Sequence, residues 1–249
     1  MDLPLPVAHA RYSQQALWTL ELRNYVFAQA GVKPTSRILE VGAGTAAVLG
    51  ALPAPNAAQG LDIDLDALRF AREVHPELKL VAGDAHRLPY PEDHFDLVYC
   101  HFLLLWLRDP PAALLEMRRV ARPGALLAAF AEPHYGGRVD QPAELEELGR
   151  LQTQALAARG AQVNIGPELP GLLRQAGLAD VESGVLSMQP ARQTNVEDSE
   201  LEQQVLRRDL QGQIEPGTLE PLLALDRAAW QQGERVLFVP THYAWGYAS

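Results

Sequence analysis

The chain has little of several features that would place it in a special class. Its 249 residues include one cysteine, Cys100. One thiol makes no internal disulfide and supports no cysteine-based zinc site, so we expect a reducing compartment, the cytoplasm, and no metal. The first residues, MDLPLPVAHARY, lack the basic start and apolar segment of a secretory signal. The longest apolar run, residues 97–107, is too short to cross a bilayer, so no membrane contact is expected.

Positive charge is also scarce, with 21 Lys and Arg residues against 31 Asp and Glu residues and a formal net charge of -10. Such a chain has no general attraction for phosphate backbones, so nucleic acid is not an expected partner. Hydrophobic residues make up 47% of the chain, which is typical of a soluble globular protein. The length is sufficient for one large α/β domain with an insertion.

Short apolar segments alternate with helix-like segments through residue 131. The segments RILEVGAG, QGLDID, LKLVAGDA, FDLVYC and residues 124–131 read as strands. Helices are expected over residues 13–30, 45–52, 65–75 and 111–120. Nearly continuous apolar strands separated by helices predict an α/β fold with a doubly wound parallel sheet covered on both faces.

The carboxyl-terminal half is more irregular. Helices are expected over residues 142–159, 168–176, 196–211 and 218–232, and strands over 181–188 and 236–245. The charges of the last two helices are interpreted as a solvated face of a lid or of a homodimer surface. We therefore expect one domain over residues 1–249: an N-terminal helical lid (1–35), a cofactor-binding core (36–132) and a substrate-side half (133–249) with a helical insertion at about 196–232.

A glycine-rich turn, Gly42-Ala43-Gly44, follows the first strand and precedes a predicted helix. Glycine permits a tight turn and leaves room for a ligand against bare backbone, and a helix start offers free N–H groups. Asp62 ends the second strand, where a carboxylate can bind a ribose diol. The turn, with Ala47, also fits the G-x-G-x-x-A pattern of dinucleotide enzymes, so an NAD(P)-dependent reductase stays an alternative.

Three further features favour a cationic adenosyl ligand over a dinucleotide. Glu40, just before the turn, would repel a pyrophosphate but suits a positively charged group. Asp84, at the end of the third strand, can accept a hydrogen bond from the adenine amine, and Ala85 offers its backbone N–H. Small reductases of this size carry a Tyr-x-x-x-Lys pair, and neither lysine of this chain follows a tyrosine at that spacing.

The segments ILEVGAGTA, GLDIDLDAL, VAGDAHRLPYPEDHFDLVYC and RRVARPGALLAAF resemble, in order and spacing, the conserved blocks of class I S-adenosylmethionine-dependent methyltransferases. The resemblance covers roughly residues 36–132, and the closing VPTHYAWGYAS is similar to the last strand of that fold. It implies a Rossmann-like seven-stranded sheet with its last strand antiparallel, and S-adenosylmethionine as cofactor.

The positions that the resemblance carries over all surround the cofactor. It implies that the methionine part is lined by Glu40, Gly42, Ala43 and Gly44, with the Cys100 carbonyl and His101 beside its end. It places Asp62 on the ribose, Ile63 on the adenine ring, and Asp84 and Ala85 at the adenine edge. Tyr12 and Gln15 would belong to a lid over the cofactor. Where many relatives carry a His-His or Glu-His pair after the fourth strand, this chain has Leu105-Trp106.

The expected reaction is methyl transfer to a small-molecule acceptor. Displacement at a sulfonium needs mainly alignment and exclusion of water, and a base only if the acceptor is protonated. His101 is the candidate base, with the alternative that it is a spacer beside the methionine. After the fifth strand, Tyr135 is expected to bound the acceptor pocket and Arg138 to bind an acidic acceptor group. A reductase and a non-catalytic methyltransferase-like protein are the alternatives.

Overall fold

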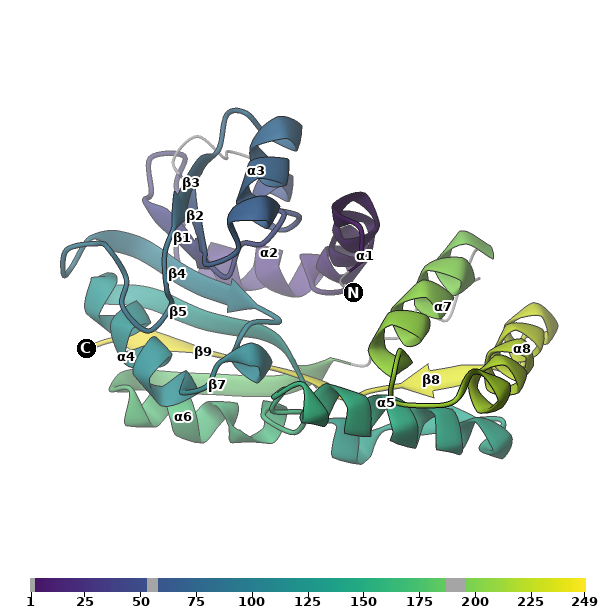
Figure 1. The fold of residues 1–249 in the computed structure, drawn as a ribbon. Coiled ribbons are helices and arrows are strands. Elements are labelled where there is room, and N and C mark those ends of the chain that lie inside the picture. Colours follow the sequence, from purple (N-terminus) through teal and green to yellow (C-terminus); the bar gives the residue numbers. More distant parts are fainter. Residues whose placement is uncertain (1–2, 53–57, 187–195) are drawn as a thin grey trace.

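The computed structural model describes residues 3–52, 58–186 and 196–249 (Figure 1). Its strands are β1 (Ile38–Val41), β2 (Ala58–Asp62), β3 (Lys79–Ala82), β4 (Phe95–His101), β5 (Ala121–Pro133), β6 (Val139–Gln141), β7 (Leu178–Leu186), β8 (Val236–Phe238) and β9 (Thr241–Ala248). Its α-helices are α1 (Leu5–Trp18), α2 (Leu20–Gln29), α3 (Leu65–Val74), α4 (Pro110–Val120), α5 (Glu146–Ala158), α6 (Leu169–Gln175), α7 (Val196–Leu210) and α8 (Pro216–Gln232).

Seven strands form one sheet in the order β3-β2-β1-β4-β5-β9-β7. The first five strands in this order run parallel, whereas β9 is antiparallel to both of its neighbours, β5 and β7. The expected seven-stranded Rossmann-like sheet with an antiparallel last strand is therefore confirmed. The single strand expected over residues 236–245 is divided at Pro240, and β8 pairs with β6 in a separate two-stranded ribbon.

Alternate side chains of the sheet enter two different hydrophobic cores. Leu39 and Val41 of β1 point to the face covered by α4 and α6, and Ile38 points to the face covered by α2 and α3. In Figure 1 the helices α1 to α3 lie above the sheet, and α4 and α6 lie below it. This division follows from the two-residue period of a strand and accounts for the nearly continuous apolar character of the sequence segments.

The prediction of a helix over residues 45–52 is wrong. Only one turn of 3-10 helix, η1 (Leu49–Ala51), forms there. Ala46 has a φ of 59°, which lies outside the right-handed helical region. Gly50 packs so closely on the His75 ring that a side chain would collide with it. The Gly-rich turn is therefore followed by irregular backbone, and the predicted helix start behind it is absent.

The helix expected over residues 13–30 is two helices, α1 and α2, divided at Thr19. The first begins at Leu5, because Pro6 lies in its first turn, where a missing N–H costs nothing. Ser13, where the predicted helix begins, therefore lies inside α1. Gly31 follows the end of α2 with a φ of 60°.

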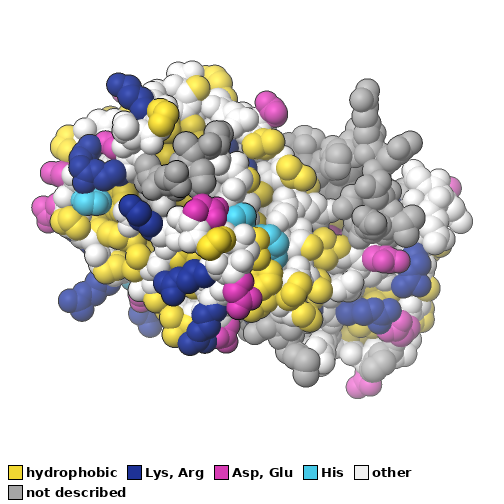
Figure 2. Space-filling view, turned by 90° about the horizontal axis from the view of Figure 1, so that it is seen from above, with side chains coloured by type: hydrophobic (Ala, Val, Ile, Leu, Met, Phe, Trp, Pro, Cys, Tyr) yellow, Lys and Arg dark blue, Asp and Glu magenta, His cyan; other side chains and the backbone are white. Residues whose placement is uncertain are grey.

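A helical lobe, formed by α5, α7 and α8, extends beyond the carboxyl ends of β4 and β5 (Figure 1). Apolar side chains from these helices, Leu148, Leu206, Leu210 and Leu223 among them, form a third hydrophobic core. On the face shown in Figure 2, acidic and basic side chains are mixed with hydrophobic ones. Within the described ranges no helix has both the length and the apolar character needed to span a membrane.

Candidate functional site

The Gly-rich turn connects β1 to the irregular segment at the carboxyl edge of the sheet. Gly42 and Gly44 have φ values of 78° and 50°, which glycine adopts without strain. The amides of Gly42 and Ala43 both donate to the carbonyl of Leu61, at 2.8 and 3.0 Å. A Cβ atom on Gly42 would lie 2.6 Å from Cδ1 of Leu103. The turn is thus held against β2 and tolerates no side chain at Gly42.

Asp62 lies at the end of β2 and bonds directly to the turn. Its Oδ2 accepts the Gly44 amide at 2.6 Å, and its Oδ1 accepts the Asp64 amide at 2.9 Å. Burial raises the pKa of this carboxyl, and the two amides act in the opposite direction. The neighbouring Ile63 is 73% exposed. The end of β2 thus presents a carboxylate beside an open apolar platform.

Asp84 and Ala85 follow β3, the next strand towards the sheet edge. The Asp84 Oδ1 atom accepts from the amide and the ring nitrogen of His86, at 2.9 and 2.7 Å. These bonds lower the pKa of Asp84. Ala85 is buried. The ends of β1, β2 and β3 therefore carry the predicted cofactor residues in the order that an extended adenosyl ligand would need.

Glu40 is a buried acid, 2% exposed, on β1. Its Oε2 accepts a hydrogen bond from the Tyr99 hydroxyl at 3.0 Å. Burial raises the pKa of the carboxyl to about 8, an effect that the Tyr99 hydrogen bond and nearby Arg23 only partly oppose. A buried carboxyl of this kind is mostly protonated at neutral pH. A cationic ligand beside it would stabilise its ionised form.

His101 ends β4, with its Nε2 atom 2.9 Å from the Thr19 hydroxyl. Burial, assisted by nearby Arg23, lowers its pKa to about 3. Such an imidazole is neutral and a poor proton acceptor, which favours the alternative that His101 is a spacer. The adjoining Cys100 thiol is also buried, and burial raises its pKa well above its usual value, so it stays protonated.

Helix α1 lies across the glycine-rich turn. His9 Nδ1 is 3.0 Å from the Thr45 hydroxyl, and the Tyr12 ring lies 4.0 Å from the position that a Cβ atom on Gly44 would take. Gln15, the other predicted lid residue, is half-buried on the same helix. Arg11 pairs with Glu202 of α7 at 2.9 Å. One helix therefore contacts both the turn and the helical lobe.

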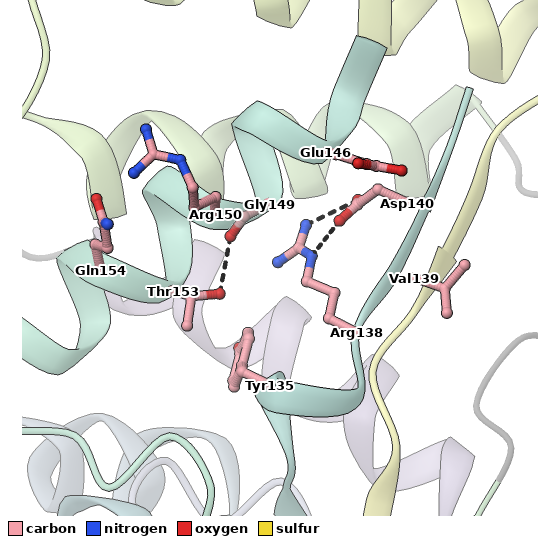
Figure 3. A pocket seen from close by; sticks show the side chains of 9 residues that line it. All are labelled: Tyr135, Arg138, Val139, Asp140, Glu146, Gly149, Arg150, Thr153 and Gln154. Atoms are coloured by element: carbon pink, nitrogen blue, oxygen red, sulfur yellow. Dashed lines mark hydrogen bonds and ion pairs between the residues drawn. The ribbon is translucent and has the colours of Figure 1, made fainter. Parts of the chain in front are cut away.

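Tyr135 and Arg138, after β5, line a pocket of about 530 Å³ together with residues of β6 and α5 (Figure 3). The Arg138 guanidinium is already committed: it forms a double hydrogen bond with Asp140, at 2.6 and 3.1 Å, and donates to Gln152 at 2.7 Å. It is also nearly buried. The expected binding of an acidic acceptor group by Arg138 stays a prediction, and such a group would have to share the guanidinium with Asp140. Burial raises the pKa of Tyr135 to about 12, so its hydroxyl is neutral.

The Arg138–Asp140 pair begins a buried polar network that reaches through the helical lobe. Asp140 also bonds to Arg235 at 2.6 Å, and Arg235 bonds to Asp226 of α8 at 2.7 Å. Through the other partner of Arg138, Gln152, the network reaches Asp209 of α7. The interpretation of the charges on α7 and α8 as a solvated face is wrong for these residues, because they bridge helices in the interior of the lobe.

Sequence reasoning missed two groups that hold the site together. Arg23 of α2 is 2% exposed and lies close to Glu40 and His101. Its signal was its place in a buried helical stripe that includes Ala16 and Val26. Glu132, near the end of β5, is buried and accepts hydrogen bonds from the amides of Leu103, Leu104 and Leu105 at 2.8–3.0 Å. It fixes the segment after β4 that lies against Gly42.

Residues 39–129 match the family model described as a methyltransferase domain. The demethylmenaquinone methyltransferase of Renibacterium salmoninarum is 36% identical over 125 residues, which is 47% of this chain and 51% of the relative. The chain spans about half the length of the curated relatives that it matches. Among solved structures, a putative methyltransferase from an antibiotic biosynthesis pathway of Anabaena variabilis aligns with a TM-score of 0.67 and 16% identity, covering 91% of this chain and 96% of that one.

Residues 39–129 thus match a methyltransferase domain, the solved structure shares the fold, and together with the strand order these matches support a class I S-adenosylmethionine-dependent methyltransferase. The reductase alternative receives no support from the comparisons, and an antiparallel strand between β5 and β7 departs from the all-parallel order of dinucleotide folds. The fold alone does not establish the reaction, because the cyclase SpnF aligns with a TM-score of 0.56 and 19% identity, covering 92% of this chain and 82% of that one.

Proposed function

We propose that the protein transfers the methyl group of S-adenosylmethionine to a small-molecule acceptor. The observation that carries this proposal is the set of side chains at the ends of β1 and β2. Glu40 is buried and mostly protonated, so a cation beside it would stabilise its ionised form. Asp62 bonds to the turn that a ribose would approach. A sulfonium ligand with an adenosyl group satisfies both requirements, whereas a pyrophosphate supplies no cation and would hold Glu40 in its neutral form.

The residues proposed to bind the cofactor fit its parts in order along the sheet edge. Glu40 and the turn at Gly42, Ala43 and Gly44 receive the methionine part. Asp62 accepts from the ribose hydroxyls. The adenine ring packs on exposed Ile63, with its edge at Asp84 and Ala85. The backbone carbonyl of Cys100 and the neutral ring of His101 border the methionine end, and Tyr12 and Gln15 of α1 cover it.

The acceptor is proposed to enter between α1, the Tyr135 segment and the helical lobe. The cofactor, when bound, supplies a methyl group on a sulfonium that a nucleophile takes by in-line displacement. The protein's contribution is then to align the acceptor and to exclude water, because the leaving thioether is neutral. Helix α1 and α7, joined by the Arg11–Glu202 pair, are suited to close that space.

The test is a methyl-transfer assay with labelled S-adenosylmethionine and fractionated small-molecule extract, with release of S-adenosylhomocysteine as the second readout. We expect label in an acceptor fraction with the wild type and a strong decrease with Gly44→Arg, which fills the turn. Arg69→Gln, an exposed change on α3, is the matched control. Binding of S-adenosylhomocysteine with no transfer to any fraction would favour the non-catalytic alternative.

A further inference from the structure

Helix α1 is attached to the rest of the molecule by few buried side chains. Only Ala8 and Ala16 of its 14 residues are buried. Two alanine methyl groups bury little apolar surface, so they contribute little to holding a helix of this length in place. The contacts of its half-buried side chains therefore weigh heavily in keeping α1 docked, that is, lying over the glycine-rich turn.

His9 is the half-buried side chain that joins α1 to both the turn and α3. Its Nδ1 atom is 3.0 Å from the hydroxyl of Thr45, which directly follows the turn. Its ring packs on the Phe70 ring of α3, with centroids 5.4 Å apart, and lies 6.3 Å from the His75 ring. His75 caps the carboxyl end of α3. Two imidazoles thus meet where α1, the turn and the end of α3 come together.

The charges around the two imidazoles are arranged unequally. The Nδ1 atom of His75 lies 3.6 Å from Oε1 of Glu77, so a protonated His75 has a partner. Within the described ranges His9 forms no ion pair with a carboxylate within 4.0 Å. The next charged side chain along α1, Arg11, is itself paired with Glu202. A protonated His9 would therefore face a second imidazole without a counter-charge of its own.

The docked position of α1 favours the neutral form of His9. Burial lowers the pKa of His9 below its usual 6.5, the charge of His75 acts in the same direction, and the bond to Thr45 opposes both. The acid of the turn, Asp62, is engaged by two backbone amides. In an undocked helix the imidazole is solvated and returns to its usual value. Docking is therefore favoured above about pH 6.5 and weakens below it, by up to tenfold per pH unit for one proton.

We propose that His9 is a pH-sensitive switch: its neutral imidazole holds α1 over the glycine-rich turn, and protonation releases the helix. Release takes the Tyr12 ring away from Gly44, where it lies 4.0 Å from the position of a Cβ atom, and uncovers the turn. The switch goes beyond the proposed methyl transfer, since His9 and His75 are not among the groups proposed to bind cofactor or acceptor. It acts below pH 6.5, whereas Glu40, with a pKa of about 8, ionises above that range.

The experiment measures amide hydrogen exchange of α1 (residues 5–18) by mass spectrometry at pH 7 and pH 5, without ligand and corrected for the intrinsic pH dependence of exchange. Residues 110–120 of α4, on the other face of the sheet, are the internal reference. In the wild type, exchange of α1 relative to α4 is expected to accelerate at pH 5, by at most about 25-fold, the limit for one imidazole with an undocked value of 6.5. His9→Gln keeps a polar side chain beside Thr45 but carries no charge, so its α1 is expected to be equally protected at both pH values.

Two further measurements protect the test against a variant in which α1 does not dock. His75→Gln keeps the bond between His9 and Thr45 and is expected to reduce the acceleration, because it removes the second charge. In the wild type, an NMR titration of the imidazoles should place the pKa of His9 below 6.5. Equal protection of α1 at pH 7 and pH 5 in the wild type overturns the inference without any variant. So does an acceleration in His9→Gln as large as that of the wild type, or a wild-type His9 that titrates at or above 6.5. Because no ligand is added, these results are independent of the proposed function.

Discussion

Binding of a cationic ligand at Glu40 is expected to release a proton. In the free protein burial raises the pKa of Glu40 to about 8, so about 90% of this carboxyl is protonated at pH 7. An ammonium beside it stabilises the charged form and lowers its pKa in the complex. Titration with S-adenosylhomocysteine at pH 7 should therefore release about 0.9 proton per ligand, measured from heats in buffers of different ionisation enthalpy.

The affinity for S-adenosylhomocysteine should follow the ionisation of Glu40. If only ionised Glu40 accepts the ammonium, the apparent Kd rises roughly 90-fold from pH 9 to pH 6, approaching tenfold per pH unit below pH 8. The groups that face Glu40 are Tyr99, Arg23 and Asp62. Burial raises the pKa of Tyr99 well above its usual value, so Tyr99 does not ionise in this window.

The control is Glu40→Gln, which should bind S-adenosylhomocysteine without this pH dependence and without proton release. This variant also distinguishes proton release at Glu40 from proton release at Glu132, a carboxyl whose pKa burial raises to about 7. The free protein offers a second readout. Because the folded pKa of Glu40 lies above the usual 4.5, its contribution to stability falls as the pH rises from about 4.5 to 8. Tight binding with no proton release and a constant Kd between pH 6 and 9 would refute the reasoning.

Three further predictions concern the turn, the lid and the lobe. Asp62→Ala should weaken S-adenosylhomocysteine by ~1–3 kcal/mol in calorimetry, the range for an unpaired buried polar group; an unchanged affinity would place the ribose elsewhere. Glu202→Gln removes the ion pair that joins α1 to α7 and should weaken this ligand roughly 3–10-fold, whereas Glu220→Gln, an exposed pair on the same lobe, should not. Gly149→Ala would push a Cβ atom into Asp140 and should lower the unfolding free energy by ~1–3 kcal/mol in urea; wild-type stability would show that the pair is free to move.

The parallel core could be predicted from the sequence because its signals are local. Each strand is a short apolar run, and the turn at Gly42 and the acid at Asp62 each follow a strand end, so strand order brings them to one edge. The helix expected after the turn does not form: Ala46 has a φ of 59°, and Gly50 packs on the ring of His75, a residue distant in the sequence. Local pattern does not report contacts between residues so far apart in the chain.

The carboxyl-terminal half was harder to predict because its charges are partnered at long range. Arg138 was predicted to bind an acidic acceptor group, although Asp140 follows two residues later, at a spacing that puts both side chains on one face of a strand. Asp226 and Arg235 pair across the end of α8 inside the lobe. Sequence composition alone does not separate such buried pairs from a solvated charged face. Arg23 was missed for the same reason, because its surroundings come from three separate segments.

The most direct measurement is a parallel calorimetric titration of the wild type with S-adenosylhomocysteine and with NADH at pH 8, where half of the Glu40 carboxyl is ionised. A site built from the glycine-rich turn, Glu40 and Asp62 should bind S-adenosylhomocysteine in a 1:1 complex and show no saturable binding of NADH. Tight binding of NADH without binding of S-adenosylhomocysteine would contradict the assignment of this site to a cationic adenosyl ligand.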